Sequence, residues 1–532
     1  PELDAILIAD SGVDTLSGTN PLKLHLDGRV GAIQVVSNFI ENAGRIIEPV
    51  SGDNQFSWSS APKLNGIYLY SYLTRNNLRV ELIHNYVTEK ERFINLLAHN
   101  PKAVIISTSF IFFKKTLRNL VADIRSIAPD IFIIAGGAFV YYSYLLLERS
   151  GKPDYETRLA EEDFLFLSAD NEPDIDLYIV HPRGESTLKT ALKRLNDGHA
   201  LDLLENTACR SGKSYFFGPR SDVISHLQSI EIDWDTLPQS MFKTGVIPLQ
   251  ASNGCPYNCS FCNFTKDPRL TFVKPIDLLV AELKSVEQRG IKYVWFVDDN
   301  FRMGRADLNA VCMQFINNNI GIKWMCFIRA STLMNADMEL LRKAGCIEVQ
   351  IGLESGDPQI LKNMNKQADP AMYAEVIGKV MHHGINVSCY FISGFPGETE
   401  TTAATTRKFI RSIENPDAPG SLSWSIYPFL LTPLSPVYEP EMRSKFELKG
   451  YLTNWTHKTM DFQQAKKLVA KAFFELENSG PIYREDNLVY LEKMTTWKKK
   501  EFFKSRHSLA KKSMRNQLQP DEIIHSFNDV IK

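Results

Sequence analysis

The chain has 532 residues, of which 44% are hydrophobic and 23% charged, and its formal net charge is −2. This composition is ordinary for a globular protein, and the length corresponds to about three or four domains at ~150 residues each. The near-neutral charge gives no reason to expect a nucleic-acid partner, and no run of about 18 apolar residues predicts a membrane span. The first residues show no export signal, and the eight cysteines do not suggest a disulfide framework. We therefore expect a cytoplasmic protein in a reducing compartment.

Residues 1–200 alternate short apolar strands with helical patterns. The expected strands are 5–9, 80–84, 103–107, 131–135 and 177–180, and the expected helices are about 62–74, 90–98, 114–127 and 185–195. Strands that alternate with helices form a parallel sheet with helices on its faces. We expect a doubly wound, Rossmann-like α/β domain whose ligand lies at the carboxyl ends of the strands.

Three loops at those strand ends are small or rich in glycine, so that a bulky ligand can approach the backbone. They contain Ser107, Thr108, Ser109 and Phe110, then Gly136 and Gly137, then Gly184 and Glu185. No G-x-G-x-x-G pattern is present, which argues against a dinucleotide. The alternative to a domain that binds a bulky ligand at these loops is a degenerate domain that packs and binds nothing, or that binds a nucleotide.

A second series of strands and helices follows an irregular linker at residues 201–245. Its expected strands are 246–251, 292–297, 322–328, 347–352, 387–393 and 422–430, and its helices are about 275–289, 305–318, 337–344, 371–383 and 399–413. A series of this kind can close into a β/α barrel, and such barrels carry their chemistry at the carboxyl ends of the strands. We expect this barrel to span residues 246–435 and a helical region to occupy residues 436–532.

Three cysteines follow the first strand of this series with C-x3-C-x2-C spacing. They are Cys255, Cys259 and Cys262, and Phe261 precedes the last of them. Thiolates at such close intervals can hold three corners of a [4Fe–4S] cluster. No His or Cys lies between Cys262 and Cys312, so one iron would stay open to a ligand that is not protein.

Two other interpretations of the triplet are a structural zinc site and three unrelated thiols. Zinc normally takes four ligands, usually as two short pairs. The other cysteines of the barrel region, Cys312, Cys326, Cys346 and Cys389, are expected to be buried core thiols.

The triplet, preceded by Gln250-Ala251-Ser252-Asn253-Gly254, resembles the motif of the radical S-adenosylmethionine (SAM) superfamily. The resemblance implies a partial (β/α)6 barrel and a cluster whose open iron chelates SAM. Electron transfer then cleaves SAM to a 5′-deoxyadenosyl radical.

A Rossmann-like domain before such a barrel is similar to the cobalamin-dependent branch of the superfamily. That likeness implies that residues 107–110 face the lower side of the corrin, and that Gly136, Gly137, Gly184 and Glu185 accommodate its nucleotide tail. Methionine-synthase-like domains carry D-x-H-x-x-G, but here Lys23 stands where the Asp of that motif would precede His25. We therefore expect His25 to be an ordinary loop histidine and the cobalt to have no imidazole ligand from the protein.

Polar motifs at the later strand ends fall in the order found in the same branch. The resemblance implies that SAM is contacted by Phe261, Asp298, Asp299, Arg329, Glu354, Gly394 and Pro396. Carboxylates can accept hydrogen bonds from the SAM ammonium and ribose, and a guanidinium can pair with its carboxylate. The segment from Gly394 to Thr399 reads G-F-P-G-E-T, as in that branch.

The combined resemblance implies a B12-dependent radical SAM methyltransferase. Methylcobalamin would donate a methyl group to an unactivated carbon of a small molecule or peptide, and a donor such as flavodoxin or ferredoxin would supply electrons. No acid or base can be named. Alternatives are a cyclase or ring-rearranging enzyme that does not transfer methyl, a radical SAM enzyme with a vestigial cobalamin domain, and a non-catalytic sensor.

Overall fold

The computed structural model folds into two compact units, Pro1–Gly18 with Pro62–Leu237, and Thr19–Ala61 with Pro238–Lys532. It describes residues 2–531 except 14–21, 43, 47–54, 153–154, 156–161, 169–170, 202–203, 213, 222–230, 264–270 and 305–306. These boundaries differ from the expected ones, because residues 19–61 separate from the rest of residues 1–200 and pack with the second unit. Part of the expected linker, residues 222–230, lies outside the described residues.

The first unit is built on one seven-stranded sheet. Its parallel strands, in spatial order, are β4 (Val80–Ile83), β1 (Ala5–Ile8), β5 (Ala103–Ser107), β6 (Phe132–Gly136) and β7 (Leu177–Ile179), and β8 (Thr207–Ser211) and β9 (Ser214–Phe217) continue it antiparallel. Its helices are α2 (Leu64–Arg75), α3 (Lys90–Leu97), α4 (Lys114–Ile127), α5 (Ala138–Ser150) and α6 (Glu185–Asn196). Numbered along the chain, the parallel strands stand in the flavodoxin-like order 2-1-3-4-5.

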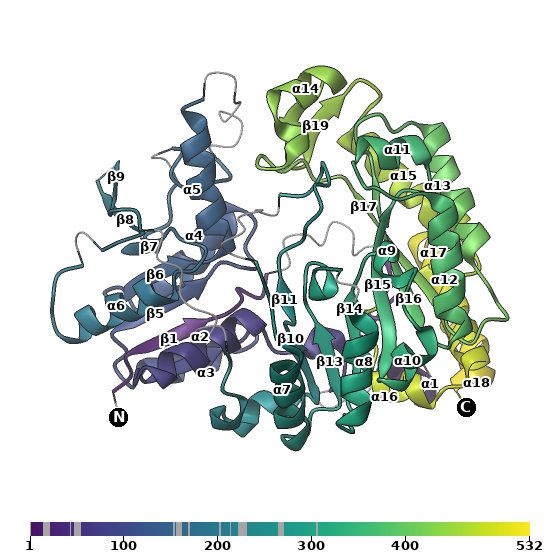
Figure 1. Ribbon diagram of the computed structural model, residues 1–532, viewed down its shortest axis with the longest axis horizontal. Helices are drawn as coiled ribbons and strands as arrows, with labels where there is room; N and C mark the ends of the chain where they lie inside the picture. The colour runs from purple at the N-terminus through teal and green to yellow at the C-terminus, as the bar shows by residue number, and fades with distance from the viewer. Residues whose placement is uncertain are drawn as a thin grey trace. The chain divides into compact units, whose positions relative to one another are not determined.

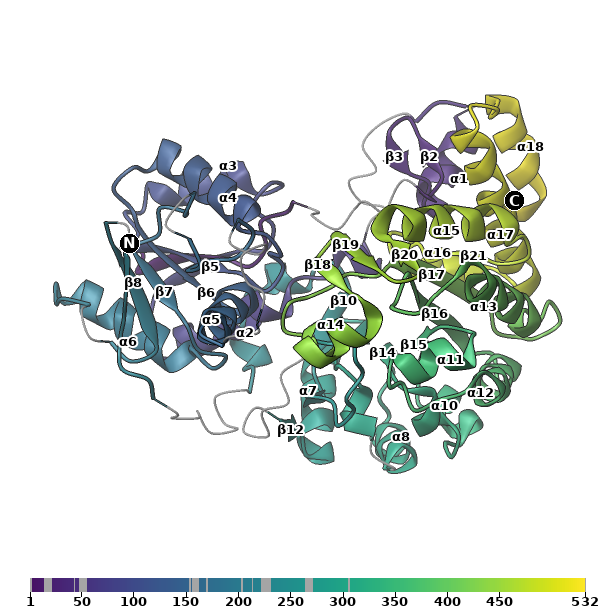
Figure 2. The ribbon, with the colours of Figure 1, turned by 90° about the horizontal axis from the view of Figure 1, so that it is seen from above.

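The strands of this sheet are apolar on both faces because helices cover both. Every residue of β1 and of β5 is buried, and Ile8 pairs with Ile83 on one side and with Ile106 on the other. Helices α2 and α6 pack together on one face, while α3 and α4 lie on the opposite face (Figure 2). The expectation of a doubly wound α/β unit is confirmed.

The second unit contains a sheet of seven parallel strands that curves into an open barrel (Figure 1). Its strands, in order, are β10 (Val246–Leu249), β13 (Tyr293–Phe296), β14 (Lys323–Phe327), β15 (Cys346–Glu354), β16 (Asn386–Ser393), β17 (Leu422–Pro428) and the short β21 (Gly480–Pro481). Helices between them are α7 (Ile276–Gln288), α8 (Leu308–Asn317), α9 (Ala330–Leu333), α10 (Met338–Lys343), α11 (Pro358–Asn363), α12 (Pro370–His382) and α13 (Glu400–Ile413). The first six strands match the expected strands and confirm the partial (β/α)6 barrel.

The region after the barrel is less helical than expected. It holds α14 (Pro440–Phe446), the antiparallel strands β18 (Lys449–Tyr451), β19 (Asn454–His457) and β20 (Met460–Asp461), and helices α15 (Phe462–Glu475), α16 (Leu488–Lys493), α17 (Thr496–Met514) and α18 (Pro520–Ile531). The three strands are too short for a periodic sequence signal, and pairing between neighbours makes them visible only in the structure.

Helix α1 (Ile33–Glu41) is not among the helices that the sequence predicted. It packs beside α16 and α18 (Figure 2). The Asp486 carboxylate accepts the backbone N–H of Ile33 at 2.9 Å, and Lys23 pairs with Glu485 at 3.1 Å. These contacts attach residues 19–61 to the C-terminal region.

His25 lies in the β2–β3 hairpin (His25–Leu26 and Arg29–Val30) of this attached segment. The hairpin belongs to the second unit, so His25 is not part of the Rossmann-like sheet.

None of the helices in the described part of the chain is both long enough and apolar enough to cross a lipid bilayer.

Replacement of Lys114 by Met tests a buried ion pair in the first unit. Lys114 Nζ lies 3.0 Å from Glu172 Oε1, and the two side chains are 2% and 1% exposed. Loss of the cation leaves a buried carboxylate uncompensated, which should lower the free energy of unfolding by about 3–5 kcal/mol. Hydrogen-exchange mass spectrometry of peptides from β6 and β7 should show correspondingly faster exchange.

The matched control is Arg220→Gln, which removes the exposed pair between Arg220 and Glu148, at 2.6 Å. Its cost should stay below about 1 kcal/mol because water screens an exposed pair. Equal exchange rates in Lys114→Met and the wild type would show that the buried pair contributes no net stability.

Candidate active site

The loop that carries the three cysteines is fastened to the barrel by its backbone. It follows β11 (Ser252–Asn253). Ser260 donates its N–H to the Met364 carbonyl at 2.8 Å, and its own carbonyl accepts the Val437 N–H at 2.9 Å. Asn365 Nδ2 donates to the Asn258 carbonyl at 2.7 Å. The loop conformation is therefore set by contacts from distant parts of the second unit.

The cysteines of this loop have the donor chemistry that an iron–sulfur cluster needs. Cys259 is buried, Cys255 and Cys262 are partly exposed, and all three are free thiols. Arg329 Nη1 lies 3.5 Å from Cys259 Sγ, and the guanidinium stacks 3.7 Å from the centre of the Tyr257 ring. Burial raises the pKa of Cys255, and the charge of Arg329 opposes this rise. A fixed cation beside the sulfurs favours the thiolate form that binds iron.

The remaining cysteines of the barrel are core thiols, as expected. Cys312, Cys326, Cys346 and Cys389 are all buried, and burial raises the pKa of each. Within the described ranges, no three His, Cys, Asp or Glu side chains converge on a single metal ion. In a cubane each thiolate binds a different iron, so a cluster does not require that convergence.

Asp298 and Asp299 support the start of the cysteine loop. The buried Asp298 carboxylate accepts the Ala251 N–H at 3.0 Å and the Ser252 hydroxyl. Asp299 accepts the Gly254 N–H at 2.9 Å. Burial raises the pKa of Asp298 to about 6, although the hydrogen bonds oppose the shift. In the structure both carboxylates thus hold the backbone that leads into Cys255.

Glu354 ends β15 and forms a buried ion pair that the sequence analysis did not foresee. Its carboxylate lies 2.8 Å from Lys366 Nζ, and the two side chains are 10% and 8% exposed. Lys366 Nζ also lies 5.7 Å from the centre of the Phe261 ring. Glu354, Lys366 and Phe261 therefore form one contiguous group beside the cysteine loop. A lysine twelve residues beyond a strand end carries no pattern that would identify it.

The turn after β16 contains Gly394, whose φ of 93° favours glycine. A Cβ there would lie 2.5 Å from Ala465 Cβ. The Gly394 N–H donates to the buried Glu398 carboxylate, and its carbonyl lies 3.1 Å from His457 Nε2. The Pro396 carbonyl accepts from Asn363 Nδ2 at 3.1 Å. The G-F-P-G-E-T turn is thus held by its own glutamate and by groups from α11 and β19.

The first unit has a cavity of ≈160 Å³ at the carboxyl ends of β5, β6 and β7. The predicted residues Ser107, Ser109, Gly136, Gly137, Gly184 and Glu185 line it, together with Asn65, Tyr68 and His181 among others. The sequence analysis did not name the last three, because two lie on a helix that precedes the loops in the chain. Six of the eight predicted residues of the first unit therefore gather around one cavity.

The cavity wall has open hydrogen-bonding capacity and little steric bulk. Asn65 Nδ2 donates to Ser107 Oγ at 2.8 Å, but Asn65 Oδ1 is buried without a partner among the described residues. Gly137 has φ 106°, and a Cβ there would lie 3.1 Å from the Thr108 backbone nitrogen. An unsatisfied buried oxygen beside a glycine wall fits a polar, bulky ligand.

Thr108 and Phe110 do not line that cavity. The buried Thr108 hydroxyl donates to the Gly136 carbonyl at 2.9 Å, so it fixes the loop. Phe110 is 39% exposed, and Lys63 Nζ lies 5.0 Å from its ring centre. Phe110 thus presents an exposed ring beside the same strand ends.

Comparison with known proteins identifies the second unit. Residues 249–410 match the family model described as the radical SAM superfamily. This match contains the three-cysteine loop and the motifs at the ends of β13 to β16.

Several curated proteins are similar in sequence. An uncharacterized methyltransferase of Pyrococcus horikoshii is 26% identical over 246 residues, covering 44% of this chain and 53% of that protein. The bacteriochlorophyllide d C-12(1)-methyltransferase of Chlorobaculum tepidum is 32% identical over 181 residues, or 32% of this chain and 39% of that protein. The anaerobic magnesium-protoporphyrin IX monomethyl ester cyclase of Rubrivivax gelatinosus is 26% identical over 270 residues, or 47% of each. The chain thus spans about half or less of the length of these relatives.

Two solved structures share the fold. The cobalamin-dependent SAM radical enzyme OxsB, with aqua-cobalamin bound, aligns with a TM-score of 0.57 at 16% identity, covering 100% of this chain and 85% of that one. The radical SAM methyltransferase TsrM from Kitasatospora setae, with cobalamin and a [4Fe-4S] cluster bound, aligns with a TM-score of 0.54 at 15% identity, covering 82% and 74%. At these identities the likeness establishes the fold.

Single Cys→Ala replacements test the cluster ligands. Cys255→Ala, Cys259→Ala and Cys262→Ala should each abolish or strongly reduce the iron and sulfide bound after anaerobic reconstitution, because each removes one corner ligand. Cys312→Ala, which changes a buried thiol of α8, is the control and should keep the wild-type iron content. Full iron binding in any of the three loop variants would contradict the assignment.

Replacement of Glu398 by Gln tests the buried carboxyl under the Gly394 turn. Burial raises the pKa of Glu398 from 4.5 to about 7, so the folded state holds this proton more tightly than the unfolded chain does. The free energy of unfolding should therefore fall by about 3 kcal/mol as pH rises from about 4.5 to about 7, and Glu398→Gln should remove this dependence. Hydrogen exchange of peptides from β16, followed over this pH range, measures the change in the free energy of unfolding.

The exposed Glu441 of α14 provides the control, because Glu441→Gln removes a carboxyl that water already solvates. Its pH dependence should match that of the wild type. If Glu398→Gln also kept the wild-type dependence, the raised pKa of Glu398 would be refuted.

Proposed function

We propose that this chain, a radical SAM enzyme of the cobalamin-dependent branch, transfers a methyl group to an unactivated carbon of a small-molecule or peptide substrate. The observation that supports this most is the combination, in one chain, of a three-cysteine barrel loop and a doubly wound unit with an open polar cavity. When bound, the cluster supplies the electron that cleaves SAM, and cobalamin supplies the methyl group.

Cys255, Cys259 and Cys262 would hold the cluster, and the charge of Arg329 would stabilise their thiolates. The contact of 3.5 Å between Arg329 Nη1 and Cys259 Sγ supports this role. Asp298 and Asp299 would act mainly by fixing the loop backbone. An external donor such as flavodoxin or ferredoxin would deliver the electrons.

SAM would lie over the carboxyl ends of the barrel strands, in reach of Phe261, Asp298, Asp299, Arg329, Glu354, Gly394 and Pro396. The ion pair between Glu354 and Lys366, at 2.8 Å, supports an ionised Glu354 that can accept from ribose hydroxyls. The glycine at residue 394 would let this turn pack closely against Ala465, since a Cβ there would lie 2.5 Å from Ala465 Cβ.

Cobalamin would occupy the first unit. Its nucleotide tail fits the cavity lined by Ser107, Ser109, Gly136, Gly137, Gly184 and Glu185, where Asn65 Oδ1 offers an unused acceptor. Thr108 would fix the loop, and the exposed ring of Phe110 would cover the lower face of the corrin. His25 would not ligate the cobalt, because Lys23 stands where the D-x-H-x-x-G motif has its aspartate.

A second candidate function is oxidative cyclisation or rearrangement without methyl transfer. It is favoured by the similarity to a relative named as a cyclase, which covers 47% of this chain. Both reactions would use the same cofactors, so the products distinguish them.

Filling the first-unit cavity tests the cobalamin site. Ser109→Trp should reduce the hydroxocobalamin retained per chain after gel filtration at least about tenfold, because an indole would occupy space that the tail needs. Ser150→Trp, at the exposed end of α5, is the control and should retain the wild-type amount. Undiminished retention by Ser109→Trp would exclude this cavity as the site.

Product analysis tests the reaction. The anaerobically reconstituted chain, with cobalamin, dithionite and methyl-deuterated SAM, should convert a candidate substrate into a product that carries the deuterated methyl group. Each product should accompany one S-adenosylhomocysteine and one 5′-deoxyadenosine. A product formed with 5′-deoxyadenosine but without S-adenosylhomocysteine would indicate the cyclase alternative, and the absence of SAM cleavage would indicate a sensor.

A further inference from the structure

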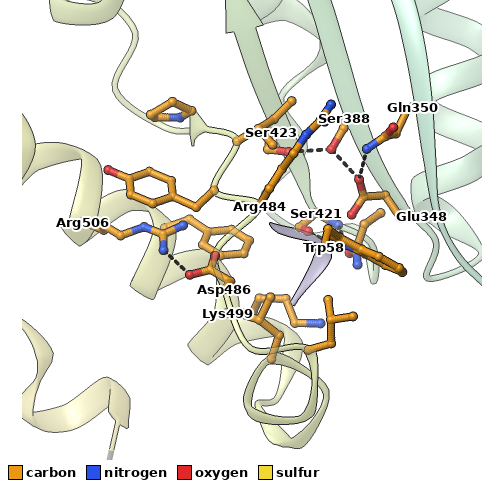
Figure 3. Close-up of a pocket in the computed structure, with 17 residues that line it drawn as sticks. Trp58, Glu348, Gln350, Ser388, Ser421, Ser423, Arg484, Asp486, Lys499 and Arg506 are labelled. Carbon is orange, nitrogen blue, oxygen red and sulfur yellow. Dashed lines mark hydrogen bonds and ion pairs between the residues drawn. The ribbon is translucent and has the colours of Figure 1, made fainter. Parts of the chain in front are cut away.

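The second unit contains another cavity, of ≈60 Å³ (Figure 3). It lies where the barrel strands begin, whereas the cysteine loop follows the end of the first barrel strand. Its polar wall comes from residues near the beginnings of β15, β16 and β17, namely Glu348, Ser388 and Ser423. Its other wall comes from the C-terminal region, including Arg484 and Lys499. None of the residues proposed to contact the cluster, SAM or cobalamin lines it.

One side of the cavity presents hydrogen-bond acceptors. Glu348 accepts from Ser388 Oγ at 2.7 Å and from Gln350 Nε2 at 3.3 Å, and it has no ion pair with any residue that the structure describes. Burial raises its pKa. Gln350 is 1% exposed, and its Oε1 has no hydrogen-bond partner in the described part of the chain. A buried acceptor of this kind normally meets a donor from protein, water or ligand.

The other side presents cations with unused donors. Arg484 Nη2 donates to the Tyr390 hydroxyl at 2.8 Å, and the guanidinium lies 4.9 Å from the Trp295 ring centre. That hydroxyl is the one side-chain acceptor that Arg484 has among the described residues, so most of its five N–H groups remain available. Figure 3 shows its side chain extending toward Ser388 and Ser423.

Lys499 adds a second cation to this side. Its ammonium makes no ion pair or hydrogen bond with the residues described, and burial lowers its pKa. By contrast, the buried Asp486 and Arg506 neutralise each other at 2.6 Å. The cavity therefore has two cations, Arg484 and Lys499, that face one carboxylate, Glu348, without a close ion pair in the described part of the chain, which leaves a net positive charge.

The size of the cavity limits what can bind there. A water molecule needs ~10–15 Å³ of such volume, so ≈60 Å³ accommodates about four to six non-hydrogen atoms. Partly buried cations without an ion pair favour an anion, since a charge removed from water is costly unless it is paired. The orphan oxygen of Gln350 and the Glu348 carboxylate also require that the ligand bring a donor of its own.

We propose that this cavity binds a small protonated oxyanion, such as hydrogen phosphate or hydrogen carbonate. Arg484 and Lys499 would donate to its charged oxygens, and its O–H would donate to Gln350 Oε1. The cavity is lined by the barrel strands and by residues of the C-terminal region that pack against them. A bound anion would therefore stabilise the packing of the C-terminal region on the barrel. The proposal does not rest on the proposed methyl transfer.

Titration calorimetry of the full chain at pH 7 tests the site, with sodium phosphate as the probe and sodium sulfate at equal ionic strength as the comparison. Sulfate matches the hydrogen phosphate dianion in size and charge but has no O–H at this pH. We expect saturable binding of one phosphate per chain and sulfate binding at least about tenfold weaker, the effect of one charge-assisted hydrogen bond.

Variants assign the binding to this cavity. Lys499→Met should weaken phosphate binding at least about tenfold, whereas Lys499→Arg should retain it. Lys498→Gln, which removes the neighbouring charge of α17, is the matched control and should bind like the wild type. Gln350→Met should remove the preference for phosphate over sulfate and supplies a second test if Lys499→Met unfolds.

Three results would overturn the proposal. They are the absence of saturable phosphate binding, equal affinity for sulfate and phosphate, and wild-type affinity in a folded Lys499→Met. The last result would also be obtained if phosphate bound in the first unit. Because none of these measurements uses SAM, their failure is distinguishable from failure of the proposed function.

Discussion

The guanidinium of Arg329 connects the parts of the site on which the barrel's chemistry depends. It stacks on Tyr257, approaches Cys259 Sγ at 3.5 Å and donates to the Lys366 carbonyl. Lys366 in turn pairs with Glu354 at the end of β15. One fixed cation thereby links the cysteine loop to two neighbouring strand ends. A lysine could not replace it, because only the planar fork can stack and donate in two directions at once.

Buried carboxyl groups play a similar part around the turns. Asp298 receives backbone and hydroxyl donors from the start of the cysteine loop, and Glu398 receives the Gly394 N–H under the turn after β16. Burial raises the pKa of each carboxyl group, and each accepts hydrogen bonds that stabilise a loop. Asp298, which the sequence predicted as a SAM contact, thus also holds a loop in shape.

The C-terminal region completes the barrel rather than forming an independent domain. Its residue Glu492 accepts from the Tyr293 hydroxyl at 2.7 Å, and Arg484 reaches Tyr390 of β16. Residues 19–61 join the same unit through Lys23 and the N-terminus of α1. The first and last parts of the second unit therefore stabilise each other, although more than 400 residues separate them in the chain.

The sequence by itself determined the two βα series, since buried parallel strands such as β1, β5 and β13 are continuous apolar runs bounded by helical patterns. It also identified the cysteine triplet, the G-F-P-G-E-T turn and the small loops of the first unit, because these patterns are local. It missed α1, α5 and the strands β8, β9 and β18–β20, whose short or unperiodic sequences are stabilised by neighbours.

Only the tertiary structure decided which polar groups meet. The pairing of Glu354 with Lys366 and the contact of Arg329 with Cys259 join residues that share no sequence pattern. No sequence pattern marks the oxygens of Asn65 and Gln350 as buried without a partner in the described part of the chain either. The attachment of residues 19–61 to the second unit was decided in the same way. Periodicity records how one element is buried, whereas charge pairing and closure depend on which elements come together in space.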